Sequence, residues 1–296
     1  MNFISILFSV FSIGIGLGGL FQIVQPRTPQ IFQDLFLYGK IKDKAKGRNG
    51  NRETFIKIIE VPKRWFLHMY IAGVVVNGVL LSALISTFVG YPIFDWLQIL
   101  PRKRIISLDY TTALLMLICI FIQVSRRTIE CLFLHVFSKS GTMNVIHYLL
   151  GITLYTLLGV SVLVETPVPK AFPEFRINIY HVVGVSMFLW SSWQHYSAHS
   201  ILASLRINPK GKILTEKHLM PRGGWFDRVS CPHYLMEILT YISFGVIQSF
   251  ANHTFCSIIL FVVVNQVVAS YITHMWYLKT FPGYPKQRKA VFPLIL

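Results

Sequence analysis

The last third of the chain carries histidines, carboxylates and arginines inside or beside long apolar runs. Gln194, His195 and His199 occupy one such run, Glu237 lies in the next, and His274 lies near the end of a third. A charged side chain inside a bilayer costs roughly 2.5–3.5 kcal/mol on insertion scales unless it finds a partner. Because so many polar side chains gather here, we predict a buried site that contacts a ligand.

The histidines also permit a metal site. His195 and His199 are four residues apart, on one face of a helix, which is a spacing that metal ligands use. Together with His218, His233 and His274 they suggest the histidine boxes of membrane di-iron oxygenases. However, the chain has no adjacent pair of histidines and no His-Glu-x-x-His motif, and carboxylates are scarce. We therefore predict no metal. Taken one at a time, the following are interpreted as hydrogen-bonding residues of a helix bundle: His135, His147, His181 and His253.

The chemistry of the surrounding residues favours a phosphorylated cofactor as the ligand. Arginine and lysine side chains donate charge-assisted hydrogen bonds to phosphate. Gly223 and Gly224 allow the backbone to approach a ligand closely, and Trp225, Tyr234 and Tyr277 offer flat surfaces for a ring.

A glycine-rich segment near the start of the chain, GIGLGG at residues 14–19, superficially resembles a dinucleotide fingerprint. It lies inside an apolar run, with no preceding strand and no acidic residue at the required distance. We predict that these glycines serve close helix packing instead.

The composition indicates what positions these residues. A mean hydropathy of +0.55, with 53% hydrophobic and 14% charged residues, is typical of a polytopic membrane protein. We expect an all-α fold of about seven transmembrane helices that form a single domain over residues 1–296, because a helix needs about 20 apolar residues to cross a bilayer. The first run lacks a basic n-region and a cleavage site and is interpreted as a retained span. The spans are expected near residues 3–25, 65–89, 108–137, 144–164, 178–202, 231–251 and 254–278.

The distribution of charge orients these helices. Lysine and arginine concentrate between the first two spans, in residues 206–228 and after residue 279, and seven crossings place all three segments on one side. The positive-inside rule makes that side cytosolic and the N-terminus lumenal, with the basic residues 102–104 as an exception. The formal net charge of +16 is explained by anionic headgroups and an anionic ligand, so no nucleic-acid partner is expected.

Longer motifs resemble a known family. Residues 190–206, MPRGGWFDRVS at 220–230, YLME at 234–237 and YLKTFPGYPKQRKAVFP at 277–293 are similar to the steroid 5-alpha-reductase family. Upstream, YGK at 38–40, VPKRWFLHMY at 61–70, RRTIEC at 126–131 and MNVIHY at 143–148 resemble its polyprenol (polyprenal) reductase branch. The resemblance covers essentially the whole chain.

The resemblance implies an NADPH-dependent reductase of the endoplasmic reticulum membrane, a seven-helix bundle without a Rossmann domain. Its substrate would be a long-chain polyprenoid lipid, reduced on the route to dolichol for protein N-glycosylation, with the cofactor bound by residues 178–296. His195, His199 and His233 stand where the steroid enzymes have Asn, Asp and Asn. Carried over by position, the cofactor contacts are Lys40, His195, His199, Arg206, His233, Glu237, His274, Tyr277 and Arg288.

The catalytic positions differ from those of the steroid enzymes. Where those enzymes have a Gln-Glu pair after Trp-Phe-Leu, this chain has His68 and Met69, and Val124 replaces their tyrosine. The differences argue against a steroid substrate. They make His68 the first candidate donor, because an imidazole donates a hydrogen bond in either protonation state.

Two further catalytic candidates are Tyr70 and Glu130. Glu130 is expected to pair with Arg127 across one helical turn, as a structural ion pair or as a pair that orients the substrate. Hydride adds readily to a double bond polarised by a carbonyl, so the aldehyde polyprenal is a better substrate than polyprenol.

Several alternatives remain at the level of sequence. A 3-oxo-steroid 5-alpha-reductase, another membrane sterol reductase or an isoprenylcysteine methyltransferase would share the buried cofactor site. A histidine-ligated metal oxidase would contain iron, and a receptor or transporter would oxidise no NADPH. The sequence indicates no obligate protein partner.

Overall fold

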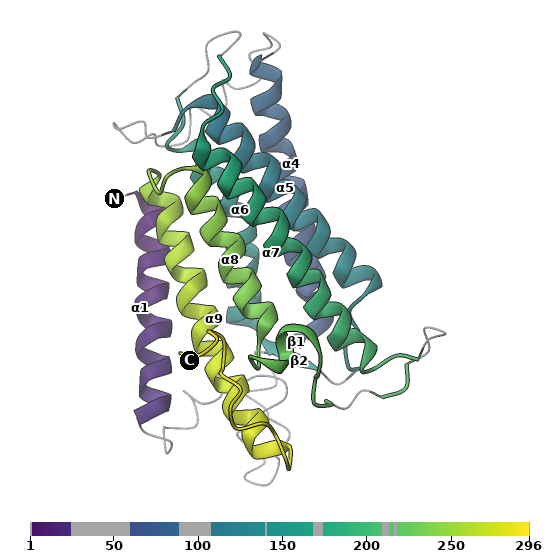
Figure 1. The fold of residues 1–296 in the computed structure, drawn as a ribbon. Coiled ribbons are helices and arrows are strands. Elements are labelled where there is room, and N and C mark those ends of the chain that lie inside the picture. The colour runs from purple at the N-terminus through teal and green to yellow at the C-terminus, as the bar shows by residue number, and fades with distance from the viewer. Residues whose placement is uncertain are drawn as a thin grey trace.

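The computed structural model describes residues 2–24, 60–88, 108–139, 141–167, 174–208, 213–215 and 218–295. In these ranges the chain forms an all-α bundle whose consecutive helices run in opposite directions (Figure 1). The predicted fold class is therefore confirmed, and a helix lies at each of the seven expected places. The helices are α1 (Phe3–Val24), α4 (Phe66–Phe88), α5 (Tyr110–Phe133), α6 (Val145–Leu163), α7 (Ile179–Ser204), α8 (Pro232–Ile247) and α9 (His253–Thr280).

Five helices of the described chain are long and apolar enough to cross a membrane: Phe3–Phe21, Lys63–Thr87, Tyr110–Phe133, Val145–Leu163 and His253–Thr280. The remaining two do not meet that standard. Helix α8 has only 16 residues, and α7 has 26 residues but carries histidines, a glutamine and serines that lower its hydropathy. The count of seven spans is thus not confirmed, and membrane crossing by α7 and α8 stays a prediction.

Polar caps explain where four of the helices begin. Asp109 accepts a hydrogen bond from the backbone N–H of Thr112 at the start of α5, and Asn144 caps α6. Asn178 and His181 form a capping box at α7, and Asn252 caps α9. Each side chain satisfies a backbone N–H that the first helical turn leaves without a partner. The observed starts lie within two residues of the expected ones because these caps precede the apolar runs directly.

Small residues allow the helices to pack closely. Helix α1 packs along α9, and α4 packs against α5 and α6. A Cβ atom added at Gly19 would lie 2.6 Å from Cγ2 of Val268, so α1 and α9 are in contact there. The predicted role in helix packing is confirmed for Gly19 and for Gly16, whose added Cβ would lie 3.6 Å from Val264, whereas Gly14 has no neighbour within 4 Å among the described residues.

Short elements close one end of the bundle. Strands β1 (Glu60–Pro62) and β2 (Thr142–Asn144) pair antiparallel, with Val61 opposite Met143. The 3-10 helix η2 (Lys63–Trp65) leads into α4, and η4 (Gly224–Asp227) precedes α8. These elements lie at the end of the bundle where α4, α6 and α8 begin (Figure 1).

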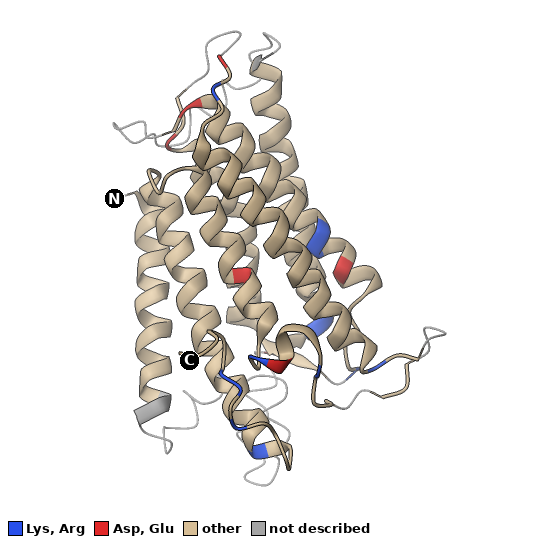
Figure 2. Cartoon of the chain, viewed as in Figure 1, with Lys and Arg blue, Asp and Glu red and all other residues tan. Residues whose placement is uncertain are grey.

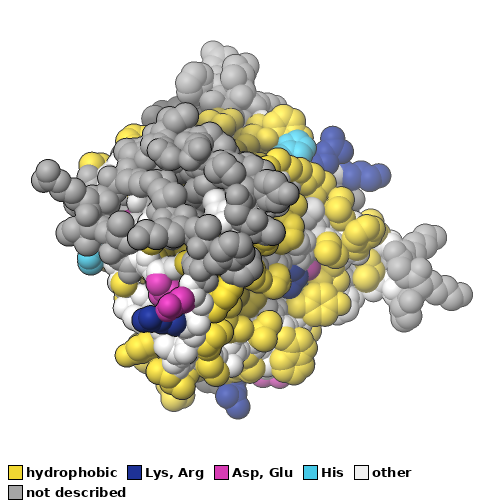
Figure 3. Space-filling model, turned by 90° about the horizontal axis from the view of Figure 1, so that it is seen from above, with side chains coloured by type: hydrophobic (Ala, Val, Ile, Leu, Met, Phe, Trp, Pro, Cys, Tyr) yellow, Lys and Arg dark blue, Asp and Glu magenta, His cyan; other side chains and the backbone are white. Residues whose placement is uncertain are grey.

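The same end carries most of the described basic residues that lie outside the bundle core (Figure 2). Its lysines and arginines include Lys63, Arg64, Lys139, Arg206, Arg222, Arg228, Lys279, Lys286, Arg288 and Lys289. Large apolar side chains are exposed along the helices, for example Ile13 of α1, Val75 of α4 and Leu260 of α9, and hydrophobic side chains are prominent in the described part of the face that Figure 3 shows. This asymmetry agrees with the predicted cytosolic side for the described chain. The basic segments at 27–57 and 102–104 lie outside the described residues, as does Lys40.

Candidate functional site

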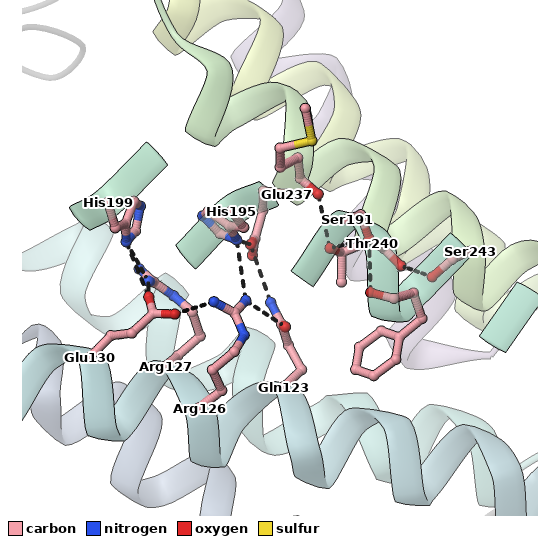
Figure 4. Close-up of polar contacts among 12 residues, drawn as sticks. Gln123, Arg126, Arg127, Glu130, Ser191, His195, His199, Glu237, Thr240 and Ser243 are labelled. Atoms are coloured by element: carbon pink, nitrogen blue, oxygen red, sulfur yellow. Dashed lines mark hydrogen bonds and ion pairs between the residues drawn. The ribbon is translucent and has the colours of Figure 1, made fainter. Parts of the chain in front are cut away.

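A group of charged and polar side chains lies inside the bundle, between α5, α7 and α8 (Figure 4). We call it the buried polar cluster, and it comprises Gln123, Arg126, Arg127 and Glu130 of α5, His195 and His199 of α7, and Glu237 of α8. All of these side chains are buried except Arg126, whose side chain is 19% exposed. Two arginines balance two glutamates, and a buried charge requires such pairing.

Glu130 is the centre of the ion pairs. Its carboxylate accepts hydrogen bonds from Arg127, three residues earlier, and from Arg126, four residues earlier. The predicted ion pair between Arg127 and Glu130 is confirmed. The contact with Arg126 was not predicted, and it places two guanidinium groups on one carboxylate.

Hydrogen bonds continue from Arg126 to Glu237 across the three helices. Arg126 Nη2 donates to Gln123 Oε1 over 2.8 Å, and Gln123 Nε2 donates to Glu237 Oε2 over 3.3 Å. His195 Nδ1 lies 3.2 Å from the same oxygen of Glu237 and 3.3 Å from Arg126 Nη2 (Figure 4). The two glutamates therefore belong to one connected network.

His199 stands at the other side of the buried polar cluster. Its Nδ1 atom lies 2.7 Å from Arg127 Nη1, 3.1 Å from Glu130 Oε2 and 2.7 Å from His135 Nε2. The interpretation of His135 as a hydrogen-bonding residue is confirmed, and its partner His199 belongs to the buried polar cluster. The ring of His233 lies 5.7 Å from that of His199, so His233 borders the same region.

Glu130, His135 and His199 offer ligand atoms that all lie within 4.8 Å of one another, a geometry that could hold a metal ion. Arg127 already contacts both Glu130 and His199, so its guanidinium group neutralises the carboxylate of Glu130. Burial, followed by the positive charge of Arg127, lowers the pKa of His135 to about 4. The positive potential that opposes protonation of His135 also opposes a metal ion, so we interpret the group as a hydrogen-bonded network.

The structure separates the two candidate donors on α4. Tyr70 is buried, and its hydroxyl accepts a hydrogen bond from Arg127 Nη2 over 3.1 Å. The Cζ atom of Arg127 lies 5.1 Å from the centre of the Tyr70 ring, which is a cation–π contact. His68 is exposed, with Nδ1 3.2 Å from the hydroxyl of Tyr148. Tyr70 therefore borders the buried polar cluster, whereas His68 lies on another face of α4.

A second set of polar side chains, the C-terminal cluster, lies near the end of α9. It comprises Ser230, His274, Tyr277, Tyr284 and Arg288. Ser230 Oγ lies 2.6 Å from both His274 Nδ1 and the hydroxyl of Tyr284, and the rings of Tyr277 and Tyr284 are stacked at 5.3 Å. Arg288 lies over the ring of Tyr284 and donates to the carbonyl of Pro221 over 2.9 Å.

Backbone pairing fixes the C-terminal segment beside the start of α8. The N–H of Ser230 donates to the carbonyl of Lys289 over 2.8 Å, and that of Cys231 donates to the carbonyl of Ala290 over 3.1 Å. Arg206, a further predicted cofactor residue, donates from Nη1 to the carbonyl of Val136 over 2.6 Å. It stands just beyond the end of α7, on the basic side of the bundle.

Known proteins resemble this chain over most of its length. The family model described as 3-oxo-5-alpha-steroid 4-dehydrogenase matches residues 141–296. A polyprenal reductase of Danio rerio is 36% identical over 281 residues, which cover 91% of this chain and 89% of that protein. The polyprenal reductase of Homo sapiens is 36% identical over 90% of this chain and 86% of its own length. The one of Xenopus tropicalis is 33% identical over 90% and 88%.

The chain belongs to the steroid 5-alpha-reductase family. Its relatives named polyprenal reductase confirm the predicted branch of the family. This is a family of reductases, and a reductase of this kind suggests a nicotinamide cofactor.

The residues of the site fit such a cofactor. Several buried polar atoms have no hydrogen-bond partner among the residues that the structure describes, including Ser192 Oγ, Ser200 Oγ, Tyr241 Oη and Arg288 Nε. Native proteins rarely leave buried polar atoms in this state, so these atoms are available to a polar ligand. Ser192 and Ser200 flank the two histidines on α7, and Arg288 supplies a guanidinium group for a phosphate.

Sequence reasoning missed part of the candidate site. Gln123 and Arg126 of the buried polar cluster were not identified, nor was Ser230 of the C-terminal cluster. A signal for the first pair was present, because residues 123, 126, 127 and 130 follow the spacing of one helix face within an apolar run. Ser230 and Tyr284 lie within motifs that carried the resemblance, but only the structure shows that their side chains are hydrogen-bonded to each other.

Proposed function

We propose that this protein is an NADPH-dependent polyprenal reductase that saturates the α-isoprene double bond of a polyprenal and yields dolichal. In this role it would support the conversion of polyprenol to dolichol, and so protein N-glycosylation, in the endoplasmic reticulum membrane. The observation that carries the proposal is the similarity to polyprenal reductases over nine tenths of the chain. The buried polar cluster supplies groups that suit the chemistry.

The first requirement of the reaction is a hydrogen-bond donor for the substrate oxygen. When bound, NADPH supplies a hydride to the β-carbon of the conjugated aldehyde. Negative charge then develops on the carbonyl oxygen, and a preorganised donor at that atom stabilises it. We assign this role to Tyr70, because its hydroxyl is buried beside Arg127.

Arg127 makes Tyr70 a better donor. The guanidinium lies 3.1 Å from the hydroxyl of Tyr70 and over its ring, so its positive charge stabilises negative charge that moves onto the phenol oxygen. Glu130 holds Arg127 through an ion pair, which makes Glu130 a positioning residue. A proton taken from water at the α-carbon balances the hydride at the β-carbon and completes the saturated aldehyde.

The remaining predicted residues are proposed to bind the cofactor. His195, His199, His233 and Glu237 would line the side of the nicotinamide, where their hydrogen bonds join α7 to α5 and α8. The C-terminal cluster would hold the phosphate-bearing part through Tyr277, His274 and Arg288. Arg206 and Lys40 would supply further positive charge at the predicted cytosolic side, where NADPH is dissolved.

A second candidate function follows from the family model, which is described by a steroid reaction. A 3-oxo-4-ene steroid also has a double bond conjugated to a carbonyl, so the same donor would serve both substrates. The absence of the expected Gln-Glu pair, replaced by His68 and Met69, favours the polyprenal.

The test compares substrates on one preparation. The purified protein in lipid vesicles is given NADPH with a long-chain polyprenal, the corresponding polyprenol or a 3-oxo-4-ene steroid, and NADPH oxidation is followed by absorbance. We expect turnover with the polyprenal alone. Preferential turnover of the steroid would establish the second candidate, and no oxidation with any substrate would refute both.

A further inference from the structure

One buried hydroxyl group near the proposed donor has no hydrogen-bond partner among the residues that the structure describes. It belongs to Tyr241 of α8, a residue that is fully buried. The ring of Tyr241 packs edge to face against that of Phe244, with the ring centres 5.6 Å apart. Buried hydroxyl groups are nearly always hydrogen-bonded in native proteins, so this one requires an explanation.

Tyr241 lies next to the buried polar cluster. It follows Glu237 by four residues and so stands one turn away on the same face of α8. Side chains of a helix lean toward its N-terminus, so the Tyr241 ring is directed back over the turn that carries Glu237. Glu237 in turn contacts Gln123 of α5. The hydroxyl of Tyr241 is therefore directed toward α5 and the interior of the bundle.

Tyr70 reaches the same stretch of α5 from another helix. It contacts Arg127, which follows Gln123 by four residues, or about 6 Å along the axis of α5. Helices α4 and α8 each pack against α5, so Tyr70 and Glu237 approach neighbouring turns of one helix from two sides. Tyr241 is close enough to Tyr70 and to Arg127 to interact electrostatically with both.

A third tyrosine, Tyr155 of α6, borders the same region. Its ring centre lies 4.8 Å from that of Tyr70. Tyr155 also interacts electrostatically with both Tyr70 and Tyr241. Tyrosines from α4, α6 and α8 therefore surround one part of the bundle interior, and a polar group of a ligand that enters it meets hydroxyl groups from more than one side.

We infer that Tyr241 donates a second hydrogen bond to the aldehyde oxygen of the substrate, beside the one from Tyr70. This inference rests on the proposed function and adds a catalytic residue to it. The hydroxyl of a tyrosine is protonated at neutral pH and can donate. A carbonyl oxygen has two lone pairs, so it accepts two hydrogen bonds, and sites that stabilise a developing oxyanion use such pairs of donors.

The hydroxyl of Tyr241 is expected to help the reaction but not the stability of the protein. A buried hydroxyl without a partner destabilises a folded protein, because it has given up its hydrogen bonds to water. The aldehyde oxygen removes this penalty when it binds, and most of all in the transition state, as negative charge grows on that oxygen. Loss of the hydroxyl should therefore slow the reaction without destabilising the protein. A hydroxyl with a purely structural role would show the opposite pattern.

The first test is Tyr241→Phe, which keeps the ring and its contact with Phe244. In single-turnover oxidation of NADPH with a long-chain polyprenal, we expect the rate to fall about 10²-fold. The Kd for NADPH should stay near wild type, and the Tm should be at or above wild type. The matched control is Tyr110→Phe, because the Tyr110 hydroxyl is also buried but donates to the carbonyl of Leu84 over 3.0 Å. The control should lower the Tm by about 2 °C or more and leave turnover normal.

The pattern of results separates the inference from the proposed function. Normal turnover by Tyr241→Phe would overturn the inference while leaving the reductase in place. A slower reaction that is explained by weaker NADPH binding would assign the hydroxyl to the cofactor and would overturn it as well. A wild-type protein that reduces no polyprenal would overturn the proposed function and the inference together.

A spectroscopic test needs no turnover. Polyprenal labelled with carbon-13 at the aldehyde carbon is bound to the protein together with NADP⁺, which cannot deliver a hydride, and its carbonyl stretch is recorded by isotope-edited infrared spectroscopy. Each hydrogen bond to a carbonyl oxygen lowers the frequency of this band. We expect a higher frequency in Tyr241→Phe than in wild type, and the wild-type frequency in Tyr110→Phe. A band that Tyr241→Phe leaves unchanged would overturn the inference.

Discussion

Replacing Tyr70 by phenylalanine tests the assignment of the donor. The change removes the hydroxyl that would stabilise the developing enolate, and the loss of one such donor lowers turnover by about 10²–10³. The fold should survive, because the ring keeps its contact with Tyr155 at 4.8 Å and its place under Arg127. Arg127 loses one hydrogen bond, which costs at most about 3 kcal/mol, but keeps its contacts with Glu130 and His199.

The assay is single-turnover oxidation of NADPH with polyprenal, together with titration of NADPH binding. We expect the rate of Tyr70→Phe to fall by the stated factor while the Kd for NADPH stays near wild type. Tyr148→Phe is the matched control, since its hydroxyl contacts the exposed His68, and it should turn over normally. If Tyr70→Phe turns over normally and His68→Phe loses about 10²-fold, the donor is His68 and the assignment from geometry is refuted.

Three further predictions concern the cofactor, metals and pH. Arg288→Ala should raise the KM for NADPH more than the KM for polyprenal, because charge-assisted contacts to phosphate are lost; equal increases would remove Arg288 from the cofactor site. Activity should survive chelators, and elemental analysis of the purified protein should find no stoichiometric iron or zinc; loss of metal and activity together would contradict this. The pKa of His135 is about 4 in the folded protein against 6.5 ordinarily, so the unfolded chain binds more protons between these values and the free energy of unfolding falls as pH drops through that range. Thermal unfolding of His135→Asn should show a smaller fall, and an unchanged pH dependence would contradict the neutral state of His135.

The fold could largely be predicted from the sequence because the apolar runs and the helix caps mark the same helices. Apolar runs gave the places of the seven long helices that the structure describes, and the observed starts of α5 and α7, which Asp109 and Asn178 cap, lie within two residues of the expected ones. The number of membrane spans could not be settled in the same way. Helix α7 carries the polar residues of the site, and this is the reason that its hydropathy no longer distinguishes a span from a buried helix.

The sequence allowed the part of the candidate site on α7 to be predicted, but not its partners on α5. The spacing of His195 and His199 gave the correct face of α7, but their partners on α5 depend on how the two helices cross, which the sequence does not encode locally. The choice between His68 and Tyr70 as the donor was limited in the same way. Their positions along the chain are close, yet residues two apart differ by about 200° around a helix. Only the structure shows that Tyr70 faces the buried polar cluster.

Transfer of deuterium tests the central claim most directly. The purified protein is incubated with a long-chain polyprenal and NADPH deuterated at the transferable position, and the product is analysed by mass spectrometry. We predict dolichal with one deuterium at the β-carbon of the former double bond. Deuterium at the aldehyde carbon with the double bond intact would show reduction of the carbonyl instead, and would contradict the proposed reaction.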